Sequence, residues 1–392
     1  MKIIALFVPQ FHRVPLNDQY WGEGFTEWVN VRNARPAYEG HKQPRVPLND
    51  NYYDLLDDEV KIWQKGLAQK YGIYGFCYYH YWFNGKKLLE QPCEQILMNK
   101  QIDLPFCFSW ANEAWTMEWV GQKKVIMPQF YGDKTEWKEH FDYLLPFFKD
   151  ERYIRHDGKP LLVLYRPEAI ECLIPMLKYW RELAVINGLP GLTLANQSPE
   201  FSQDRHEGMN QFDLDIEFEP MTSNKHMYKN KFAILKRIRR AVMHFCERKF
   251  GWDLRRTGSH IIRNITKTNR ISYDLAWKNI LTRETYSEKT IPCAFVNWDN
   301  TPRYKERGQI YVGSTPAKFR KYLSQLIQRC KSKYHKDMMF IFAWNEWGEG
   351  GYLEPDEENG YGYLEAVRDA LIENNEFPIK AEGSEEDIKL AL

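Results

Sequence analysis

Residues 338–349 read MMFIFAWNEWGE, and this stretch is the starting point for the fold prediction. Its first six residues are apolar without alternation, which is typical of a strand buried on both faces, as in a parallel sheet. Tryptophans, an asparagine and two glutamates, Glu346 and Glu349, follow this run directly. The rest of the chain repeats the pattern of an apolar strand that ends in polar and aromatic side chains.

Eight runs of this kind are spread along the 392 residues. They lie at residues 3–9, 73–79, 105–110, 160–165, 192–195, 214–218, 292–296 and 338–343. Amphipathic segments typical of helices follow most of them, at 59–71, 135–148, 169–187, 316–334 and 363–373. Eight buried strands interleaved with helices predict an α/β fold, a (β/α)8 TIM barrel, in preference to an open sheet.

Polar and aromatic residues lie at the carboxyl end of every one of these runs. In chain order they are QFH at 10–12, YHYWFN at 79–84, WANE at 110–113, YRP at 165–167, NQ at 196–197, EFEP at 217–220, NWDN at 297–300 and NEWGE at 345–349. In a barrel, the carboxyl ends of all strands lie on one face, where active sites form. These scattered residues are therefore predicted to form one pocket.

The composition is ordinary for a globular protein except for an aromatic content of 15%, with 14 tryptophans and 24 tyrosines. Sugars present apolar C–H faces, so aromatic rings at strand ends favour a carbohydrate ligand. The net charge of +1 gives no general attraction to nucleic acid or membrane. Seven scattered cysteines without a CxxC pair predict buried, reduced thiols. The amino terminus resembles a strand more than a signal peptide, and no run reaches the length of a membrane span, so we expect a soluble cytoplasmic protein.

The chain is expected to form one catalytic domain over residues 1–376, followed by an acidic tail at 377–392. Residues 221–290 are a predicted insertion between the sixth and seventh strands. Within it, residues 221–270 contain fourteen Lys or Arg and two acidic residues, and residues 231–250 predict an amphipathic helix. This basic stretch is either the solvated face of a barrel helix or a surface for an anionic polysaccharide, a membrane or a lipid-linked glycan.

Glu346 and Glu349 are the candidate catalytic residues. Glycosidic cleavage needs two carboxyl groups, one to protonate the leaving oxygen and one to assist at the sugar. The flanking Trp344 and Trp347 can desolvate a carboxylate and raise its pKa, so that it acts as an acid near neutral pH. In the alternative, structural interpretation, the glutamates cap backbone amides or pair with arginine. Their position between tryptophans at a barrel mouth favours catalysis.

Several motifs resemble the WbsX-type family of polysaccharide-biosynthesis proteins, often labelled glycosyltransferases, which is related to the glycoside hydrolase family 99 endo-α-mannosidases. The matching stretches are VPQFH at 8–12, WGEGFTEW at 21–28, GHKQPR at 40–45, YGIYGFCYYHYW at 71–82, WANE at 110–113 and NEWGEG at 345–350. These motifs are spread over residues 2–220 and 291–354. No motif matches residues 221–290.

The resemblance implies an enzyme that acts, with retention, on an α-linked sugar of a bacterial surface polysaccharide of the O-antigen or capsule type. By analogy with the hydrolases, Glu346 would be the base that acts on the substrate's own 2-hydroxyl, giving a 1,2-anhydro sugar. Glu349 would serve as the acid and then as the base. Gly348 stands where the mannosidases usually have His, so the resemblance leaves the identity of the sugar open.

A wider set of residues at the strand ends is expected to bind the sugar, with Trp115 and Trp119 as stacking platforms. The predicted set is Gln10, His12, Trp28, Tyr79, His80, Trp82, Trp110, Asn112, Glu113, Trp115, Arg166, Glu217, Glu219, Trp298, Asp299, Asn345 and Trp347. Glu23 and Glu27 on the first loop are candidates to close over the ligand. Aromatic runs of this kind are found in cores about as often as in pockets.

Other chemistries have less support in the sequence. We expect no metal and no cofactor, because there is no GxGxxG motif, phosphate-binding loop, GxSxG elbow or zinc-type histidine spacing. Residues 213–215 (DLD) have the Asp-x-Asp form with which many nucleotide-sugar transferases hold a metal, but alternation at a strand start also produces it. Two other functions stay open: a glycosyltransferase of lipopolysaccharide or capsule biosynthesis that uses a nucleotide-sugar donor, and a glycan-binding barrel without catalysis.

Overall fold

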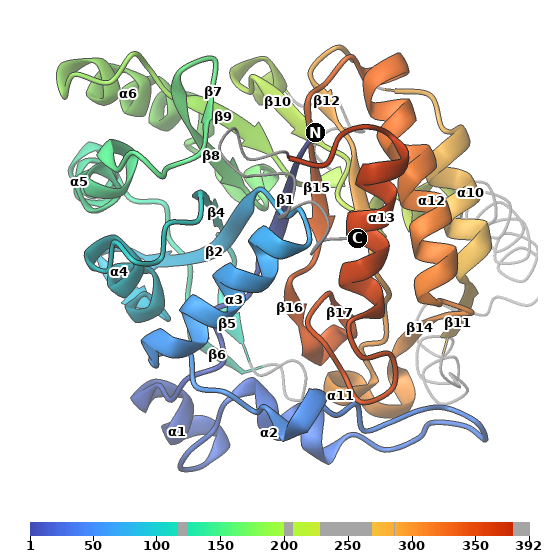
Figure 1. Cartoon of the computed structure of the whole chain (residues 1–392). Coiled ribbons are helices and arrows are strands. Elements are labelled where there is room, and N and C mark those ends of the chain that lie inside the picture. The colour runs from blue at the N-terminus through green and yellow to red at the C-terminus, as the bar shows by residue number, and fades with distance from the viewer. Residues whose placement is uncertain (117–123, 200–206, 228–268, 286, 379–392) are drawn as a thin grey trace, which may run out of the picture.

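The computed structural model describes residues 1–116, 124–199, 207–227, 269–285 and 287–378, which form a barrel of parallel strands surrounded by helices (Figure 1). The barrel strands are β1 (Lys2–Phe7), β2 (Gly75–Phe83), β4 (Phe106–Trp110), β8 (Lys159–Leu164), β9 (Thr193–Asn196), β10 (Leu214–Ile216), β12 (Thr290–Ile291), β13 (Cys293–Phe295) and β15 (Met338–Phe342). Their order around the sheet is β12-β10-β9-β8-β4-β2-β1-β15-β13. Only Pro292 separates β12 from β13, so the two ends of this path belong to one run and the sheet closes as a (β/α)8 barrel.

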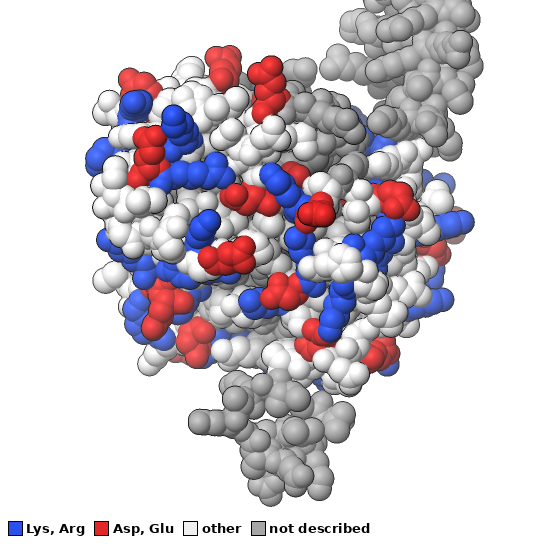
Figure 2. Space-filling model, turned by 90° about the horizontal axis from the view of Figure 1, so that it is seen from above, with Lys and Arg blue, Asp and Glu red and all other residues white. Residues whose placement is uncertain are grey.

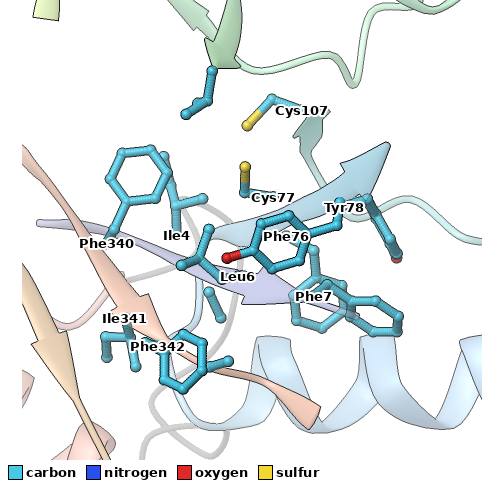
Figure 3. Close-up of a cluster of buried hydrophobic side chains, with 14 of the residues drawn as sticks. Ile4, Leu6, Phe7, Phe76, Cys77, Tyr78, Cys107, Phe340, Ile341 and Phe342 are labelled. Atoms are coloured by element: carbon cyan, nitrogen blue, oxygen red, sulfur yellow. The ribbon is translucent and has the colours of Figure 1, made fainter. Parts of the chain in front are cut away.

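The barrel strands are buried along most of their length because the sheet packs on two layers of apolar side chains. β1 lies between β15 and β2, with Ala5 opposite Ile341 on one side and Leu6 opposite Cys77 on the other. Figure 3 shows part of the core that these strands share, from Ile4 to Phe342. Runs that are apolar without alternation therefore mark strands covered on both faces.

The helices that cover the outside of the barrel alternate with the strands. They are α3 (Asp58–Lys70), α4 (Gln91–Met98), α5 (Lys134–Lys149), α6 (Leu173–Ile186), α10 (Tyr273–Thr282), α12 (Pro316–Arg329) and α13 (Gly362–Glu373). Local sequence sets where they begin: the Asp133 carboxylate accepts from the backbone N–H of Thr135 at the start of α5, and Thr315 caps α12 in the same way. Their apolar faces, such as Phe319 and Leu323 of α12, are buried against the sheet and neighbouring helices.

Short elements gather at the carboxyl ends of the strands, at the lower end of the molecule in Figure 1. They are α1 (Pro15–Trp21), α2 (Glu27–Asn33), β3 (Lys86–Leu88), the hairpin of β5 (Trp115–Thr116) and β6 (Val125–Met127), α11 (Thr301–Tyr304), β16 (Asn345–Glu346) and β17 (Gly351–Tyr352). A separate parallel pair joins β11 (Asn269–Ser272) to β14 (Gln309–Val312), and β7 (Arg155–His156) pairs with β8. The elaborated loops of the fold thus lie on the face where barrel enzymes build their sites.

All eight predicted strands and the five predicted helices are present. The seventh strand is divided by Pro292 into β12 and β13, and the predicted helix at 169–187 begins only at Leu173, after a 3-10 turn over Pro167–Ala169. The predicted helix at 316–334 ends with a π turn over Cys330–Tyr334.

Much of the basic stretch and of the acidic tail cannot be compared with the prediction. Residues 228–268 and 379–392 lie outside the described residues, and with them the predicted helix at 231–250. Around this gap, residues 221–227 are helical and β11 and α10 follow it. None of the described helices has the length and apolar character needed to cross a membrane. On the end of the molecule seen in Figure 2, the described Lys and Arg are interspersed with Asp and Glu.

Candidate active site

A cavity of about 420 Å³ opens at the carboxyl ends of the strands. This volume lies in the range of small-molecule sites, about 300–1,000 Å³. The residues that line the cavity come from the ends of the barrel strands and the loops after them: Val8, Gln10, Tyr79, Tyr81, Ala111, Glu113, Ala114, Trp115, Thr116, Tyr165, Phe218, Met221, Trp298, Asn300, Arg303, Tyr304, Phe342, Glu346 and Glu349. Both candidate catalytic glutamates are among them.

The segment after β15 brings these two glutamates into the cavity by a tight turn. β16 and β17 form an antiparallel ladder, and a 3-10 turn over Trp347–Glu349 joins them. Gly350 ends the turn at φ 65°, in the left-handed region that favours glycine. A Cβ on Gly350 would lie 3.0 Å from the backbone nitrogen of Asp299, whose N–H donates to the Glu349 carbonyl at 2.7 Å. Glycine at this position therefore permits the close approach that fixes Glu349.

Asn345 fixes the other end of the turn. Its side-chain oxygen accepts from the Val8 N–H at 2.8 Å, and its side-chain nitrogen donates to the Val8 carbonyl at 3.0 Å. This pair of hydrogen bonds ties the segment after the last strand to the end of β1. Asn345 is fully buried, so it acts on the site through Glu346 rather than by contact with a ligand.

Arg303 of α11 lies between the two candidate glutamates. Its Nη2 is 3.0 Å from Glu346 Oε1 and its Nη1 is 3.0 Å from Glu349 Oε1. Its Nε donates at 2.8 Å to Oε1 of a third carboxylate, Glu27 of α2. We call these four residues the Arg303 cluster. Arg303 of α11 thus joins α2 to the turn after β15, two segments that are far apart in the sequence.

Gly348 makes room for this cluster. A Cβ at this position would lie 2.1 Å from Glu27 Oε1 and 2.8 Å from Arg303 Nε, so no larger residue fits while Glu27 and Arg303 keep their places. Gly348 was the position where the sequence departs from the mannosidase pattern. In this structure, the space that a side chain at position 348 would need is occupied by the Glu27–Arg303 pair.

Burial raises the pKa of both Glu346 and Glu349. The Arg303 guanidinium opposes this rise, while the negative charge of Glu27 adds to it. Two carboxyl groups with raised pKa values beside one another favour a state in which the pair keeps a proton near neutral pH. Such a pair can offer one acid and one base in the same cavity.

Glu354 lies next to the segment at 344–349 and accepts four hydrogen bonds. Its Oε1 accepts from Trp344 Nε1 at 2.9 Å and Gln64 Nε2 at 2.7 Å. Its Oε2 accepts from Trp347 Nε1 at 2.7 Å and the Tyr53 hydroxyl at 2.9 Å. Both tryptophans that flank Glu346 are therefore anchored on one buried carboxylate, whose pKa burial raises to about 7.

Several predicted binding residues line the cavity beside the pair: Gln10, Tyr79, Glu113, Trp115 and Trp298. Gln10 Nε2 donates to the Tyr81 hydroxyl at 3.1 Å, and the Tyr79 hydroxyl accepts from Gln197 at 3.0 Å. These hydrogen bonds hold the polar groups of the wall in place.

Arg166 Nη1 binds Glu113 at 2.7 Å and its Nε binds Glu168. Asn112 is buried below them and holds the Arg166 backbone, donating to its carbonyl at 2.7 Å and accepting from its N–H at 2.8 Å. The motif at 110–113 thus supplies two wall residues, Ala111 and Glu113, and one support, Asn112.

A second group of predicted residues is packed in the core instead of lining this cavity. His80 Nε2 lies 2.8 Å from Nε2 of His140, and the rings of Trp82 and Trp110 pack on His140. Burial lowers the pKa of His80 to about 3, so its ring is neutral at physiological pH. Trp28 donates to the Tyr53 carbonyl at 2.8 Å.

Trp347 stacks on Tyr352, with ring centroids 3.7 Å apart, and its Nε1 is held by Glu354. Asp299 accepts from Gln43 at 2.7 Å and lies 2.8 Å from His41 Nε2, so it ties the GHKQPR motif to the loop after β13. His12 is also buried and lines a different hollow, which is formed with residues 13–16, 86–91 and Met127.

Glu217 and Glu219 form a separate ion cluster around Arg283, which we call the Arg283 cluster. Arg283 Nη2 lies 2.9 Å from Glu217 Oε2 and 2.6 Å from Glu219 Oε1. All three side chains are buried, and none of them lines the cavity. Trp119 lies in 117–123, outside the described residues.

The sequence missed the residues that organise the pair. Arg303 lies three positions beyond the stretch at 297–300 that it singled out, and no local pattern marks it. Glu354 follows the turn at 347–349 without any motif, and Tyr81 lies in the stretches at 71–82 and 79–84 but is not among the predicted binding residues. Glu27 was noted as a loop residue, and its position next to Arg303 depends on long-range packing.

The described residues include no group of three or more His, Cys, Asp or Glu arranged to hold a metal ion. In the DLD stretch, Asp213 pairs with Arg181 at 3.0 Å, and Asp215 accepts from Asn196 at 3.1 Å. These two carboxylates therefore bind neighbouring protein groups at the start of β10. The six described cysteines form no disulfide.

The structure thus combines a barrel of parallel strands with a carboxyl-lined cavity at the carboxyl ends of its strands. A family model described as Glycosyltransferase WbsX matches residues 3–367, and the chain belongs to this family. The protein WxcX from two strains of Xanthomonas campestris pv. campestris is 34% identical over 372 residues. That match covers 94% of this chain and 49% of WxcX, so the chain spans about half the length of these curated relatives.

Solved structures share the fold at low identity. The GH99 endo-alpha-mannosidase from Bacteroides thetaiotaomicron aligns with a TM-score of 0.54 and 12% identity, over 95% of this chain and 97% of that one. A glycoside hydrolase-like protein aligns with a TM-score of 0.53 and 12% identity, over 97% and 94% of the two chains. At this identity the likeness establishes the barrel and its topology.

Proposed function

We propose that this chain cleaves or transfers an α-linked glycosyl unit of a bacterial surface polysaccharide with retention of configuration, and that Glu346 and Glu349 carry the reaction. One observation carries the proposal: two carboxyl groups after the last strand, the buried Glu346 and the partly buried Glu349, line one cavity and share one guanidinium. Because Arg303 reaches both, the carboxyl groups are close neighbours.

In the first step, Glu346 takes the proton from the sugar 2-hydroxyl, and the freed oxygen attacks C1. The bond from C1 to the leaving oxygen breaks, and Glu349 gives that oxygen a proton. The products of this step are a 1,2-anhydro sugar and the released alcohol. Burial raises the pKa of Glu349, as a proton donor requires, and it raises the pKa of Glu346 as well, so the division of roles within the pair rests on the resemblance to the hydrolases.

In the second step, Glu349 takes a proton from water or from an acceptor hydroxyl, whose oxygen attacks C1. The C1–O2 bond of the anhydro ring breaks, and O2 regains its proton from Glu346. Two inversions at C1 give net retention. Water as the nucleophile makes the chain a hydrolase, and a sugar hydroxyl makes it a transglycosylase.

The second candidate function is a glycosyltransferase with a nucleotide-sugar donor. The description of the family to which the chain belongs favours it. Such an enzyme would need contacts for the donor phosphates. Among the described residues that line the cavity, the arginine is already shared by three carboxylates, which favours the hydrolase-like reaction.

A turnover assay distinguishes the two functions. The protein is incubated with α-glycosyl fluorides and with surface oligosaccharides, each with and without nucleotide sugars, and the products are separated by chromatography. Cleavage or transfer without a nucleotide is the expected result. Product formation only with a nucleotide sugar would replace the proposal with the transferase, and glycan binding without any turnover would identify a binding module.

A further inference from the structure

Arg303 contacts a third carboxylate, that of Glu27, in addition to the two of the Glu346/Glu349 pair. The Arg303 cluster contains three carboxylates and one guanidinium, so its formal charge with all groups ionised is negative. Glu27 is itself almost completely buried, and its Oε2 has no hydrogen-bond partner within the described part of the chain. The negative charge of Glu27 is therefore offset mainly by Arg303, the same group that offsets Glu346 and Glu349.

The groups that face this cluster come from every element around it. Glu27 belongs to α2, Glu346 to β16 and Glu349 to the turn after it, and Arg303 itself to α11. β2 adds the Tyr81 hydroxyl, whose pKa burial raises above its usual range. Tyr165 faces the pair from the end of β8, and Glu113 with its partner Arg166 faces it from the loop after β4. Arg303 is the cation that contacts both members of the pair.

Close packing keeps Glu27 in contact with Arg303. The backbone at Gly348 is so near that a Cβ would overlap Glu27 Oε1 and crowd Arg303 Nε. The Gly348 position lies between Glu346 and Glu349, so the turn that carries the pair packs directly on the Glu27–Arg303 contact. Movement of Glu27 or Arg303 would thus disturb both the positions and the charges of the pair.

We propose that Arg303 and Glu27 are positioning residues that set the protonation state of the Glu346/Glu349 pair, with Arg303 favouring ionisation and Glu27 favouring retention of one proton. The inference rests on the proposed function, since the pair must alternate between an acid and a base. Three carboxylates around one guanidinium retain a proton more readily than two would, because like charges repel in a buried site. Arg303 contacts both glutamates at 3.0 Å and favours ionisation of each, and the negative charge of Glu27 opposes this for both, so the balance of the two lets the pair hold one proton.

Opposite changes of charge give opposite predictions. The variant Glu27→Gln removes a negative charge, so both limbs of the pH profile of kcat/KM should move to lower pH. The variant Arg303→Met removes the positive charge, so both limbs should move to higher pH. A neighbouring charge shifts a pKa by about 1–3 units, so each displacement should reach about one pH unit. Arg303→Lys keeps the charge and should keep the profile near that of the natural protein, with a lower rate because the two-nitrogen contact is lost.

An exposed arginine–glutamate pair provides the matched control. Arg320 of α12 contacts Asp369 and Glu373 of α13 on the surface, away from the cavity. Arg320→Met and Glu373→Gln make the same changes of charge and should leave the pH profile in place. A shift in these controls would mean that net charge, and not contact with the pair, moves the profile.

A second readout does not depend on turnover. Glutamate labelled with ¹³C at the side-chain carboxyl is titrated by NMR in the full chain, and the signals of the pair are assigned by their loss in Glu346→Gln and Glu349→Gln. The proposal expects the midpoints to fall in Glu27→Gln and to rise in Arg303→Met. Midpoints that do not move, or that move in the same direction in both variants, would overturn it. If titrations move as expected but no glycan is turned over, the proposed function fails and the assignment of Arg303 and Glu27 stands.

Discussion

The Arg303 cluster and the Arg283 cluster both place glutamates around one arginine, yet they differ in what else reaches the carboxylates. In the Arg283 cluster, the Tyr334 hydroxyl donates to Glu217 at 2.7 Å and the Ser223 N–H donates to Glu219 at 3.0 Å. Those carboxylates are buried, and groups of the protein donate the hydrogen bonds that they accept. In the Arg303 cluster, the two candidate glutamates line an open cavity and share their arginine with Glu27.

The difference shows why residue types alone do not identify a catalytic site. EFEP at 217–220 and NEWGE at 345–349 both supply two glutamates near the end of a barrel strand. Only the second pair faces a space that a sugar can enter. A buried ion cluster that is fully satisfied stabilises one packing, whereas carboxylates with an excess of negative charge at a cavity can exchange protons with a substrate.

The largest expected effect is a difference in kcat between substitutions in the two clusters. Glu346→Gln and Glu349→Gln should each lower kcat by about a thousandfold, because proton transfer to and from the sugar is lost. Glu217→Gln in the Arg283 cluster should leave kcat within a few fold of the natural protein. The measurement is turnover of the best substrate from the panel, with folding checked by circular dichroism. Comparable losses in all three variants would mean that the cavity does not distinguish the pairs.

The next effect separates them by stability. Arg283→Met leaves two buried carboxylates without their cation and should lower the free energy of unfolding by about 3–5 kcal/mol. Urea unfolding measures this change. The folded fraction of the variant should still turn over substrate, because none of the Arg283 cluster lines the cavity. An unchanged unfolding midpoint would show that the cluster contributes little to the fold.

Glu354→Gln should have an intermediate effect on the rate. Four donors converge on the Glu354 carboxylate, and the amide nitrogen of glutamine would meet a donor instead of accepting from it. The tryptophans beside Glu346 would then shift, and kcat should fall by about ten- to a hundredfold, or about 1.4–2.8 kcal/mol. Glu357→Gln, on the exposed loop nearby, is the control. An unaltered kcat in Glu354→Gln would remove Glu354 from the support of the site.

The smallest expected effect is on stability as a function of pH. The folded pKa values of Glu346 and Glu349 are raised above that of an unfolded glutamate, about 4.3. The folded state therefore holds a proton that the unfolded state has released. This contribution to stability is complete below pH of about 4.3 and is lost as the pH rises through the folded pKa.

The natural protein loses this stability at high pH because the buried Glu346 must ionise. The variant Glu346→Gln avoids part of that loss, since glutamine does not ionise. The variant should be more stable than the natural protein at pH 8, by about 1 kcal/mol, with a smaller difference at pH 5. Thermal unfolding at the two pH values measures it. A variant that is less stable at pH 8 than at pH 5, relative to the natural protein, would contradict the raised pKa.

The sequence predicted the barrel because buried parallel strands leave a strong local pattern. Most runs, such as residues 3–9 and 338–343, are apolar on successive residues, and all eight became barrel strands. The pair Glu346/Glu349 and the wall residues Gln10, Glu113 and Trp298 were found because polar residues at strand ends converge on one face.

The remaining site residues could not be predicted in this way. Trp82 and Trp110 lie at the carboxyl ends of β2 and β4, and Trp28 lies in α2 on the same face of the barrel, yet their rings pack in the core. Periodicity does not distinguish these directions at a strand end. Arg303 and Glu354 act through contacts with residues far away or across a turn, which no local pattern records. Their roles follow only from three-dimensional packing.

The configuration of the first-formed product tests the central claim most directly. A reducing oligosaccharide or sugar released from an α-linked substrate is followed by ¹H NMR within the first minutes, before mutarotation. A reaction through the substrate's own 2-hydroxyl, carried by Glu346 and Glu349, predicts that the α-anomer appears first. Initial release of the β-anomer would contradict the retaining reaction and the roles assigned to this pair.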